Sequence, residues 1–487
     1  MVTFVLSLIL LFVGYVVYGR VIERVFGPDD RVTPAVRMND GVDYIVLPSW
    51  KVFMIQFLNI AGTGPIFGAI MGAKFGPAAY LWIVFGCIFA GAVHDYMSGM
   101  LSIRNNGAGL PEIIGLYLGQ TTKKIMLVFS VFLLMMVGAV FVYSPALILG
   151  KICGDNLTWV YIWCGLIFAY YLVATLLPID KIIGKIYPLF AVSMLFMAVA
   201  LAVVLLVKWP TLPELTDGLW GEGFQQPIFP ALFITIACGA ISGFHATQTP
   251  LMARCTKSEK MARPLFYGAM ITEGVVALIW ATVSMYFFYG GAAHELGQPL
   301  TLQAPEVVTA VSQGWLGTFG GLLAMLGVVA APITSGDTAL RSSRLIIAEF
   351  IHLEQHSIAK RLMICVPLFA ATMVLLFFNI ENPDGFNVIW SYFGWANQTL
   401  AVFTLWSITV YLVRERKAFV VTLLPAIFMT VVCSTFLMIS PNAFGMDMVV
   451  GYGVGGAALI ASIPESAMTF ISCSICSMFS FMRLIWL

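Results

Sequence analysis

Apolar stretches of about 20 residues, the length that a helix needs to cross a bilayer, alternate with short polar connections along most of the chain. Twelve such stretches are predicted to be membrane-spanning helices, at 3–19, 52–72, 78–100, 125–150, 157–177, 186–207, 229–249, 264–290, 313–336, 361–379, 386–412 and 417–440. The tail at 446–487 adds one more, because its glycine-rich part at 446–463 favours a re-entrant or surface segment over a second span. The pattern therefore predicts an all-α polytopic membrane protein with about 13 transmembrane helices.

Two of these stretches are interrupted by small residues at matching places. Residues 57–68 read FLNIAGTGPIFG, so that Gly62, Gly64 and Pro65 break the second span. Residues 233–243 read FITIACGAISG and repeat the pattern in the seventh span, with Gly239 opposite Gly64 when one residue is left unpaired. Matching interruptions in two halves of a chain indicate a transporter's binding site, whereas close helix packing in lipid is the plainer explanation.

The positive charges give the orientation of the spans. Lys and Arg number 21 in the odd-numbered connections and only 3 in the even-numbered ones. Because basic residues stay in the cytoplasm, the N-terminus is predicted outside and, with a single span in the tail, the C-terminus inside. The second and seventh spans then cross in opposite directions, each with its break about 10 residues in, near the bilayer centre.

The two breaks are five spans apart, in spans 2 and 7, which is the arrangement of a five-plus-five inverted repeat. Spans 2–6 form one half and spans 7–11 the other, with discontinuous helices at spans 2 and 7. The predicted organisation is a first helix and cytoplasmic loop at 1–51, the first repeat at 52–207, the second at 229–412, and peripheral helices at 413–487. Packing alone explains the glycines but not their spacing, depth and inversion together.

Composition narrows the possible functions. The chain is 60% hydrophobic and only 10% charged, so we expect it to be embedded in membrane lipid. Its net charge of +1, without a basic block, gives no reason to expect a nucleic-acid partner. Nine scattered cysteines suggest no disulfide framework, and no metal or cofactor motif is expected. The chain contains no HExxH, GxSxG or phosphate-binding loop motif, so we expect a transporter of a small molecule rather than an enzyme.

Six motifs in order along the chain resemble the carbon starvation protein A family. They are TPAVRMNDGVDY at 33–44, IAGTGP at 60–65, GAVHDY at 91–96, FITIACGAISGFH at 233–245, SGDTALR at 335–341 and FGWANQ at 393–398. The resemblance implies a bacterial cytoplasmic-membrane transporter induced by carbon limitation, with peptides or pyruvate as substrate and with proton coupling in some members. It also implies the five-plus-five core of the amino acid–polyamine–organocation superfamily. Position 94 is His, where some members have Gln.

The predicted substrate site lies at the two breaks, where half-helix N-termini attract anions and freed carbonyls attract cations. A carboxylate, common to pyruvate and peptides, would bind backbone N–H groups there. The site residues are Gly62, Thr63, Gly64, Cys238, Gly239, Ser242 and His245.

Ionisable groups inside apolar spans are candidates for coupling or gating. Asp95, Glu273 and Asp337 map to the cytoplasmic third of the bilayer, as proton carriers below the substrate or as an inner gate. Glu273 is the preferred proton site, whereas Asp337 could instead pair with Arg341 one turn later. His94 could relay protons, although packing is the commoner role of a lone histidine.

Three further hypotheses concern hydroxyls, amides and the first cytoplasmic loop. Carbonyls near Ala61 with the hydroxyls of Thr334 and Ser335 could hold sodium, as the resemblance implies, or the hydroxyls could bond back to their own helix. Asn397 and Gln398 are expected to tie helices together rather than to touch substrate. The loop at 31–44 could brace an inner gate through Asp40 and Asp43 or be a solvated connector.

The leading prediction is a cation-coupled symporter, with a proton more strongly favoured than sodium, that imports peptides or small carboxylates such as pyruvate. A channel is a weaker alternative because channels are usually built by symmetric assembly, whereas one chain here carries two inverted halves. A starvation-responsive membrane sensor without transport is another alternative.

Overall fold

The computed structural model describes residues 1–154, 156–176, 179–219, 227–355, 357–382 and 385–461, and within them it omits the side chains of 176, 179–186 and 385–387. Every regular element in these ranges is a helix. Ten helices are long and apolar enough to cross a membrane, and the bent pair at the second predicted span brings the count to 11. The all-α polytopic architecture is therefore confirmed.

The first half of the chain follows the predicted order of spans. The second span is a broken pair, α4 (Ser49–Ala61) and α5 (Gly64–Gly72), bent by 42°. The remaining helices are α1 (Val2–Val16), α2 (Tyr18–Phe26), α3 (Pro34–Arg37), α6 (Ala78–Leu81), the π-helix η2 (Trp82–Gly91), α7 (Ala92–Arg104), α8 (Leu110–Leu118), α9 (Gln120–Cys153), α10 (Leu157–Leu176) and α11 (Ile179–Lys208).

The second half begins with the other broken helix, α12 (Ala231–Thr235) and α13 (Gly243–Ala253). After it come the π-helix η5 (Arg263–Tyr267), α14 (Gly268–Tyr289), α15 (Ala292–Glu295), α16 (Ala304–Phe350), α17 (Ile358–Glu381), α18 (Gly385–Arg414), α19 (Val420–Ile439) and α20 (Met448–Ala461). Part of the thirteenth predicted span, 462–487, lies outside the described residues. Its glycine-rich beginning is the 14-residue helix α20, which is shorter than a span.

Helix α16 differs most from the prediction. It bends at Gly317, where φ is 68°, so a first arm at 304–316 precedes the membrane-crossing part. That part ends at Phe350 rather than near residue 336. Arg341 and Arg344 on its extension are buried inside the protein, which is why the helix continues where hydropathy falls.

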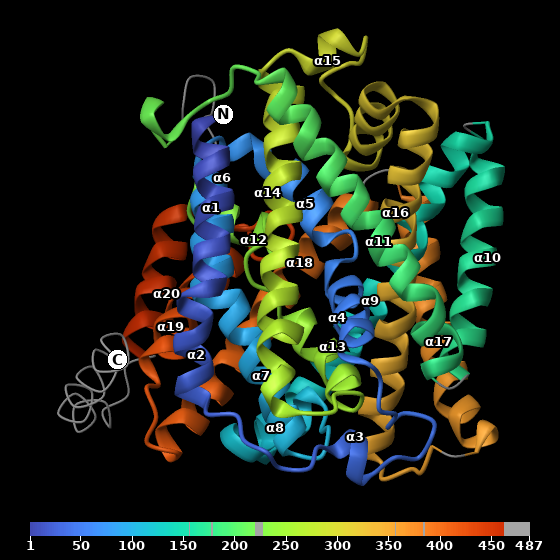
Figure 1. Ribbon diagram of the computed structural model, residues 1–487, viewed down its shortest axis with the longest axis vertical. Helices are drawn as coiled ribbons and strands as arrows, with labels where there is room; N and C mark the ends of the chain where they lie inside the picture. Colours follow the sequence, from blue (N-terminus) through green and yellow to red (C-terminus); the bar gives the residue numbers. More distant parts are fainter. Residues whose placement is uncertain (155, 177–178, 220–226, 356, 383–384, 462–487) are drawn as a thin grey trace.

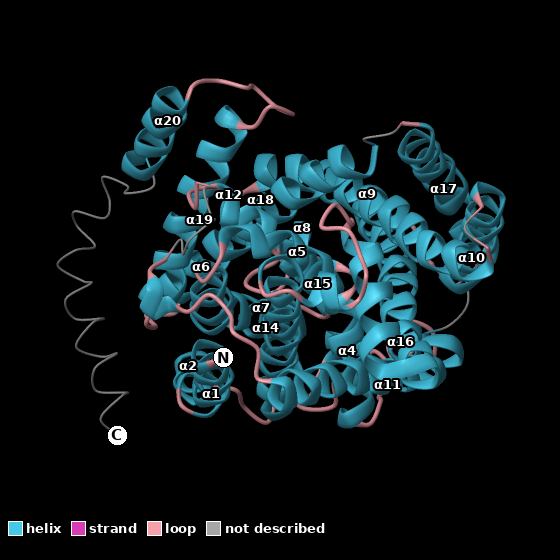
Figure 2. Ribbon diagram, turned by 90° about the horizontal axis from the view of Figure 1, so that it is seen from above, coloured by secondary structure: helices cyan, strands magenta, loops and turns pink. Residues whose placement is uncertain are grey.

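The helices stand side by side, with α3 and α8 at one end of the molecule and α15 at the other (Figure 1). Seen along the bundle, α5, α7 and α14 occupy the interior, whereas α1, α10, α17 and α20 lie at the periphery (Figure 2). Glycines allow the interior helices to touch: a Cβ on Gly68 of α5 would lie 2.9 Å from the carbonyl oxygen of Thr235 on α12. The two broken helices therefore meet in the centre of the bundle.

Candidate functional site

The first break lies between α4 and α5. Gly62 has φ 47° and ψ −139°, a conformation that glycine adopts without a steric penalty. Pro65 then occupies the first turn of α5, where its missing N–H costs no hydrogen bond. A helix broken in this way frees backbone polar groups that lipid cannot satisfy, so they have to face protein, water or a ligand.

The second break is longer and is held by a side chain from α18. Residues 236–242 separate α12 from α13. The Asn397 Oδ1 accepts hydrogen bonds from the Ser242 hydroxyl at 2.9 Å and from the Phe244 N–H at 2.6 Å, which caps the first turn of α13. Gln398 also donates from Nε2 to the Phe233 carbonyl at 2.8 Å, so both amides tie α18 to the broken helix as expected.

The two breaks are in direct contact. A Cβ on Gly64 would lie 2.3 Å from the Cys238 Sγ, and one on Gly239 would lie 2.3 Å from the Ala277 Cβ. Thr63 is fully buried, and its hydroxyl has no hydrogen-bond partner among the described residues. The residues predicted for the substrate site thus come together at one place in the bundle: Gly62, Thr63, Gly64, Cys238, Gly239, Ser242 and His245.

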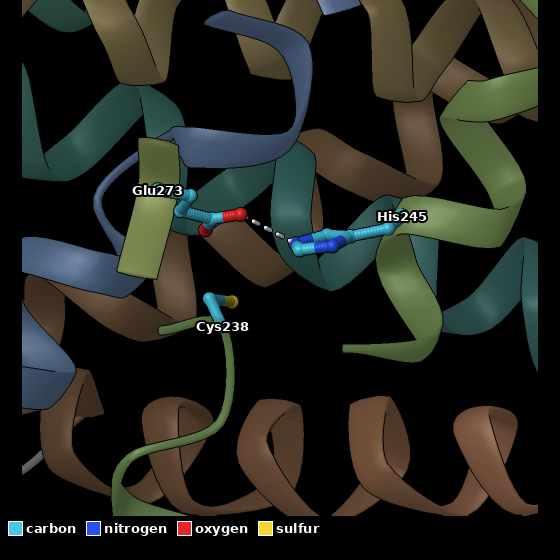
Figure 3. A group of neighbouring side chains, drawn as sticks. All are labelled: Cys238, His245 and Glu273. Carbon is cyan, nitrogen blue, oxygen red and sulfur yellow. Dashed lines mark ion pairs between the residues drawn. The ribbon is translucent and has the colours of Figure 1, made fainter. Parts of the chain in front are cut away.

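Two histidines and two carboxylates join this place to neighbouring helices. His245 on α13 contacts both acids. Its Nδ1 lies 2.8 Å from Asp95 Oδ2 on α7. Its Nε2 lies 3.3 Å from Glu273 Oε2 on α14, the contact that Figure 3 shows. The other Asp95 oxygen lies 2.8 Å from His94 Nδ1. None of these four side chains is exposed.

Burial makes the protonation of this four-residue cluster interdependent. Each isolated buried charge is costly, whereas a protonated histidine next to a carboxylate is stabilised by the pair. Separating the helices would change these contacts and hence the number of protons that the cluster holds. Glu273 has neither carboxylate oxygen in a hydrogen bond among the described residues, so it is the member most open to a new partner.

Cys238, His245 and Glu273 also offer sulfur, nitrogen and oxygen atoms within 4.8 Å of one another. Borderline transition ions accept such donors. However, His245 and Glu273 already face each other as an ion pair (Figure 3). We therefore interpret the group as a histidine–carboxylate cluster at the break.

The two acids predicted to couple or gate transport lie beside the second break. Asp95 and Glu273 both contact His245, which is two residues into α13. Their predicted place in the cytoplasmic third of the bilayer stays a prediction.

Asp337 and Arg341 belong to a different group from the histidine cluster. The Tyr187 hydroxyl on α11 lies 2.6 Å from Asp337 Oδ2 and 3.0 Å from the Thr334 carbonyl oxygen. Arg341 donates from Nη2 to the Ala174 carbonyl at 2.5 Å, and its Nη1 lies 3.6 Å from Asp43 Oδ1. Arg341 thus contacts α10 and the loop at 31–44, whereas the prediction considered a pair with Asp337.

The hydroxyls considered for sodium are engaged within the protein. Ser335 donates to the Leu58 carbonyl in the last turn of α4, at 2.8 Å, so it joins α16 to the first break. Thr334 bonds back to the Ala330 and Ala331 carbonyls of its own helix at 2.9 Å. The first contact places Ser335 close to Ala61, and the second matches the alternative of back-bonded hydroxyls.

The loop at 31–44, predicted to be cytoplasmic, is fastened to the rest of the protein. Asp40 accepts hydrogen bonds from the N–H groups of residues 42–44, so it shapes its own turn instead of meeting an arginine. Asp43 does meet arginines, Arg341 and Arg344, but they lie on α16 rather than in a loop. Beside this turn, burial raises the pKa of Tyr44 above its ordinary value. The loop is thus closer to a brace than to a solvated connector.

The sequence reasoning missed polar residues near the first break. Among the described residues, neither polar atom of the buried Asn59 amide has a hydrogen-bond partner, and the Oε1 of the buried Gln56 has none either. Tyr187, which contacts Asp337, was also missed. The available signal for Gln56 and Asn59 was an amide inside an apolar span, within two turns of the break.

Comparison with known proteins identifies relatives along most of the chain. A family model described as "Carbon starvation protein CstA" matches residues 1–151, 150–315 and 291–436. A protein from Haemophilus influenzae, "Uncharacterized membrane protein", is 47% identical over 59% of this chain and 91% of its own length. "Peptide transporter CstA" from Escherichia coli is 26% identical over 92% of this chain and 82% of its own. "Pyruvate/proton symporter BtsT" from the same organism is 31% identical over 51% of this chain and 43% of its own.

Solved structures agree with this architecture. A manganese transporter from Eremococcus coleocola aligns with 92% of this chain and 99% of its own, with a TM-score of 0.55 and 12% identity. A sodium-coupled sialic acid symporter covers 94% of this chain and 96% of its own, with a TM-score of 0.55 and 10% identity. At these identities the likeness shows a shared fold: that of membrane transporters.

Proposed function

The chain belongs to the carbon starvation protein CstA family, and from that premise we propose that it is a secondary active transporter importing short peptides or small carboxylates such as pyruvate. Relatives named as a peptide transporter and as a pyruvate/proton symporter support this substrate range. We place the protein in the bacterial inner membrane, with its odd-numbered connections in the cytoplasm. We assign it no catalytic reaction.

One observation carries the proposal: the two broken helices touch at a buried histidine–carboxylate cluster. Gly64 of the first break packs on Cys238 of the second, and His245 on the second broken helix contacts Asp95 and Glu273. A substrate carboxylate entering between the breaks would find freed N–H groups, the Thr63 hydroxyl and the imidazole of His245. Packing alone gives no reason for two buried acids at this point.

The same geometry supports cation coupling. His245 is the bridge between two carboxylates, so a movement of α13 breaks contacts with α7 and α14 together. We infer that a proton, more than a sodium ion, binds when the breaks separate and leaves when they close. The groups facing this proton are His94 and Asp95 on α7, Glu273 on α14, and the thiol of Cys238.

Uptake into proteoliposomes tests the proposal. Labelled pyruvate and a labelled dipeptide are offered separately, each under an imposed proton gradient or sodium gradient. Accumulation of at least one substrate above its equilibrium level under the proton gradient is the expected result. Failure to accumulate either substrate under any gradient rejects the symporter and leaves the sensor alternative.

A further inference from the structure

A second site lies away from the breaks, in a cavity of about 400 Å³. It is formed where α9 ends, α10 begins, the first arm of α16 starts and α17 ends, and the three connections there are predicted to face outside. Ligand pockets usually measure about 300–1,000 Å³, so the space suits a small molecule. We call it the outer cavity.

Opposite charges stand next to each other in the outer cavity. The Lys151 ammonium lies 3.2 Å from Glu306 Oε1, and both side chains are 39% exposed. Both are long, and about two-fifths of each is in water, so the pair can open at little cost to admit a molecule that carries both charges. Among the described residues these are the two charged side chains that line the space.

A buried amide lines the same cavity. Asn379 near the end of α17 is 1% exposed, and neither its Nδ2 nor its Oδ1 has a hydrogen-bond partner among the described residues. Buried polar groups are rarely left in this state, so an unsatisfied one calls for an explanation such as a ligand. A primary amide offers one acceptor and donors side by side, which match the N–H and C=O of a peptide group.

We propose that the outer cavity binds a short zwitterionic peptide before transport. The peptide's ammonium pairs with Glu306, its carboxylate pairs with Lys151, and its peptide group hydrogen-bonds with Asn379. Apolar side chains of the ligand contact Leu147 and Val160, which also line the space. Pyruvate, without an ammonium or an N–H, matches only part of this set.

Binding to the purified full chain in detergent tests the site, with dialanine as the probe and calorimetry as the measurement. Asn379→Leu and Glu306→Gln are expected to weaken dialanine binding at least tenfold, whereas Gln313→Leu, which changes an exposed amide on the first arm of α16 outside the cavity, leaves it unchanged. N-acetylated, C-amidated dialanine, which lacks both charges, should not compete. Unchanged affinity in both cavity variants, or no binding of dialanine by the wild type, overturns the proposal.

Uptake measurements distinguish failure of the outer cavity from failure of the proposed importer. The role of the cavity in uptake rests on that proposed function. Asn379→Leu should raise the KM for dialanine uptake without lowering kcat, and pyruvate uptake should stay at the wild-type level. If dialanine binds in an Asn379-dependent way but nothing accumulates in vesicles, the outer cavity stands and the importer fails. If peptide accumulates equally well in the Asn379→Leu protein, the importer stands and the outer cavity fails.

Discussion

Gly64 offers the sharpest test of the contact between the two breaks. A Cβ at this position would lie 2.3 Å from the Cys238 Sγ and 2.5 Å from the Cys238 Cβ. Carbon contacts are optimal near 3.5–4.0 Å, so Gly64→Ala forces the breaks apart by about 1.2 Å or more. Overpacking of this kind costs about 1–3 kcal/mol, which lowers the population of the closed contact by roughly 5–150-fold.

A compensating change at Cys238 removes that cost. Cys238→Gly deletes both atoms that the new methyl group meets, and the next atom, the Cα of residue 238, is 3.9 Å away. The Gly64→Ala/Cys238→Gly double variant should therefore recover most of the uptake that Gly64→Ala loses. The matched control is Cys238→Ala combined with Gly64→Ala. It keeps the Cβ of residue 238 at 2.5 Å from the new methyl group, so it should not restore uptake.

The assay is initial uptake into proteoliposomes that contain equal amounts of each variant, with retention on a size-exclusion column as the check of folding. The uptake rates of the wild type, Gly64→Ala, Cys238→Gly and the double variant form a double-mutant cycle. This cycle gives the coupling energy between positions 64 and 238, which is expected at about 1–3 kcal/mol. Wild-type uptake by Gly64→Ala alone would refute the reasoning. Equal rescue by Cys238→Ala would also refute it, because the contact could not then be the cause.

Three further variants probe other parts of the structure. Glu273→Gln keeps the shape but cannot ionise, so proton-driven accumulation should fall at least about tenfold while counterflow exchange continues; loss of both would indicate a structural role. Ser335→Ala removes one hydrogen bond to α4, worth about 1 kcal/mol, and proton-driven uptake should persist, whereas its complete loss would favour a sodium site. Asp43→Asn removes the buried negative charge that faces Arg341 and Arg344. Because breaking a buried ion pair can cost up to about 3–5 kcal/mol, the melting temperature should fall and amide hydrogen exchange at 33–47 should become faster. Unchanged exchange there would show that the loop does not depend on this carboxylate.

Much of the architecture could be predicted from the sequence because lipid imposes few solutions on a spanning segment. The apolar stretches marked the spans, and the glycines at 62 and 64 marked the break between α4 and α5. The match to 233–243 also pointed to a real break, although it extends over 236–242 and is longer than the first. The division into two repeats at 52–207 and 229–412 stays a prediction.

Hydropathy was less informative where polar residues are buried within the protein. Asp337, Arg341 and Arg344 lie inside α16, yet their polarity made the span look finished near residue 336. Hydropathy measures affinity for lipid, whereas these side chains meet partners on other helices.

The partners of the predicted site residues could not be found from spacing in the chain. His245 is 150 residues from Asp95, and Asn397 is 155 residues from Ser242. Each residue type suggested a role, but only the fold shows that His245 bridges two acids while Arg341 contacts the loop at 31–44. The sequence gives even less indication of the outer cavity, because Asn379 is simply the last residue of a predicted span, 361–379.

The central claim is that cation-coupled transport runs through the contact between the two breaks. The most direct measurement is accumulation of labelled pyruvate and dialanine in proteoliposomes under a proton gradient, compared between the wild-type protein and Glu273→Gln. The account predicts accumulation by the wild type and only equilibration by the variant. Equal accumulation by both proteins would contradict it.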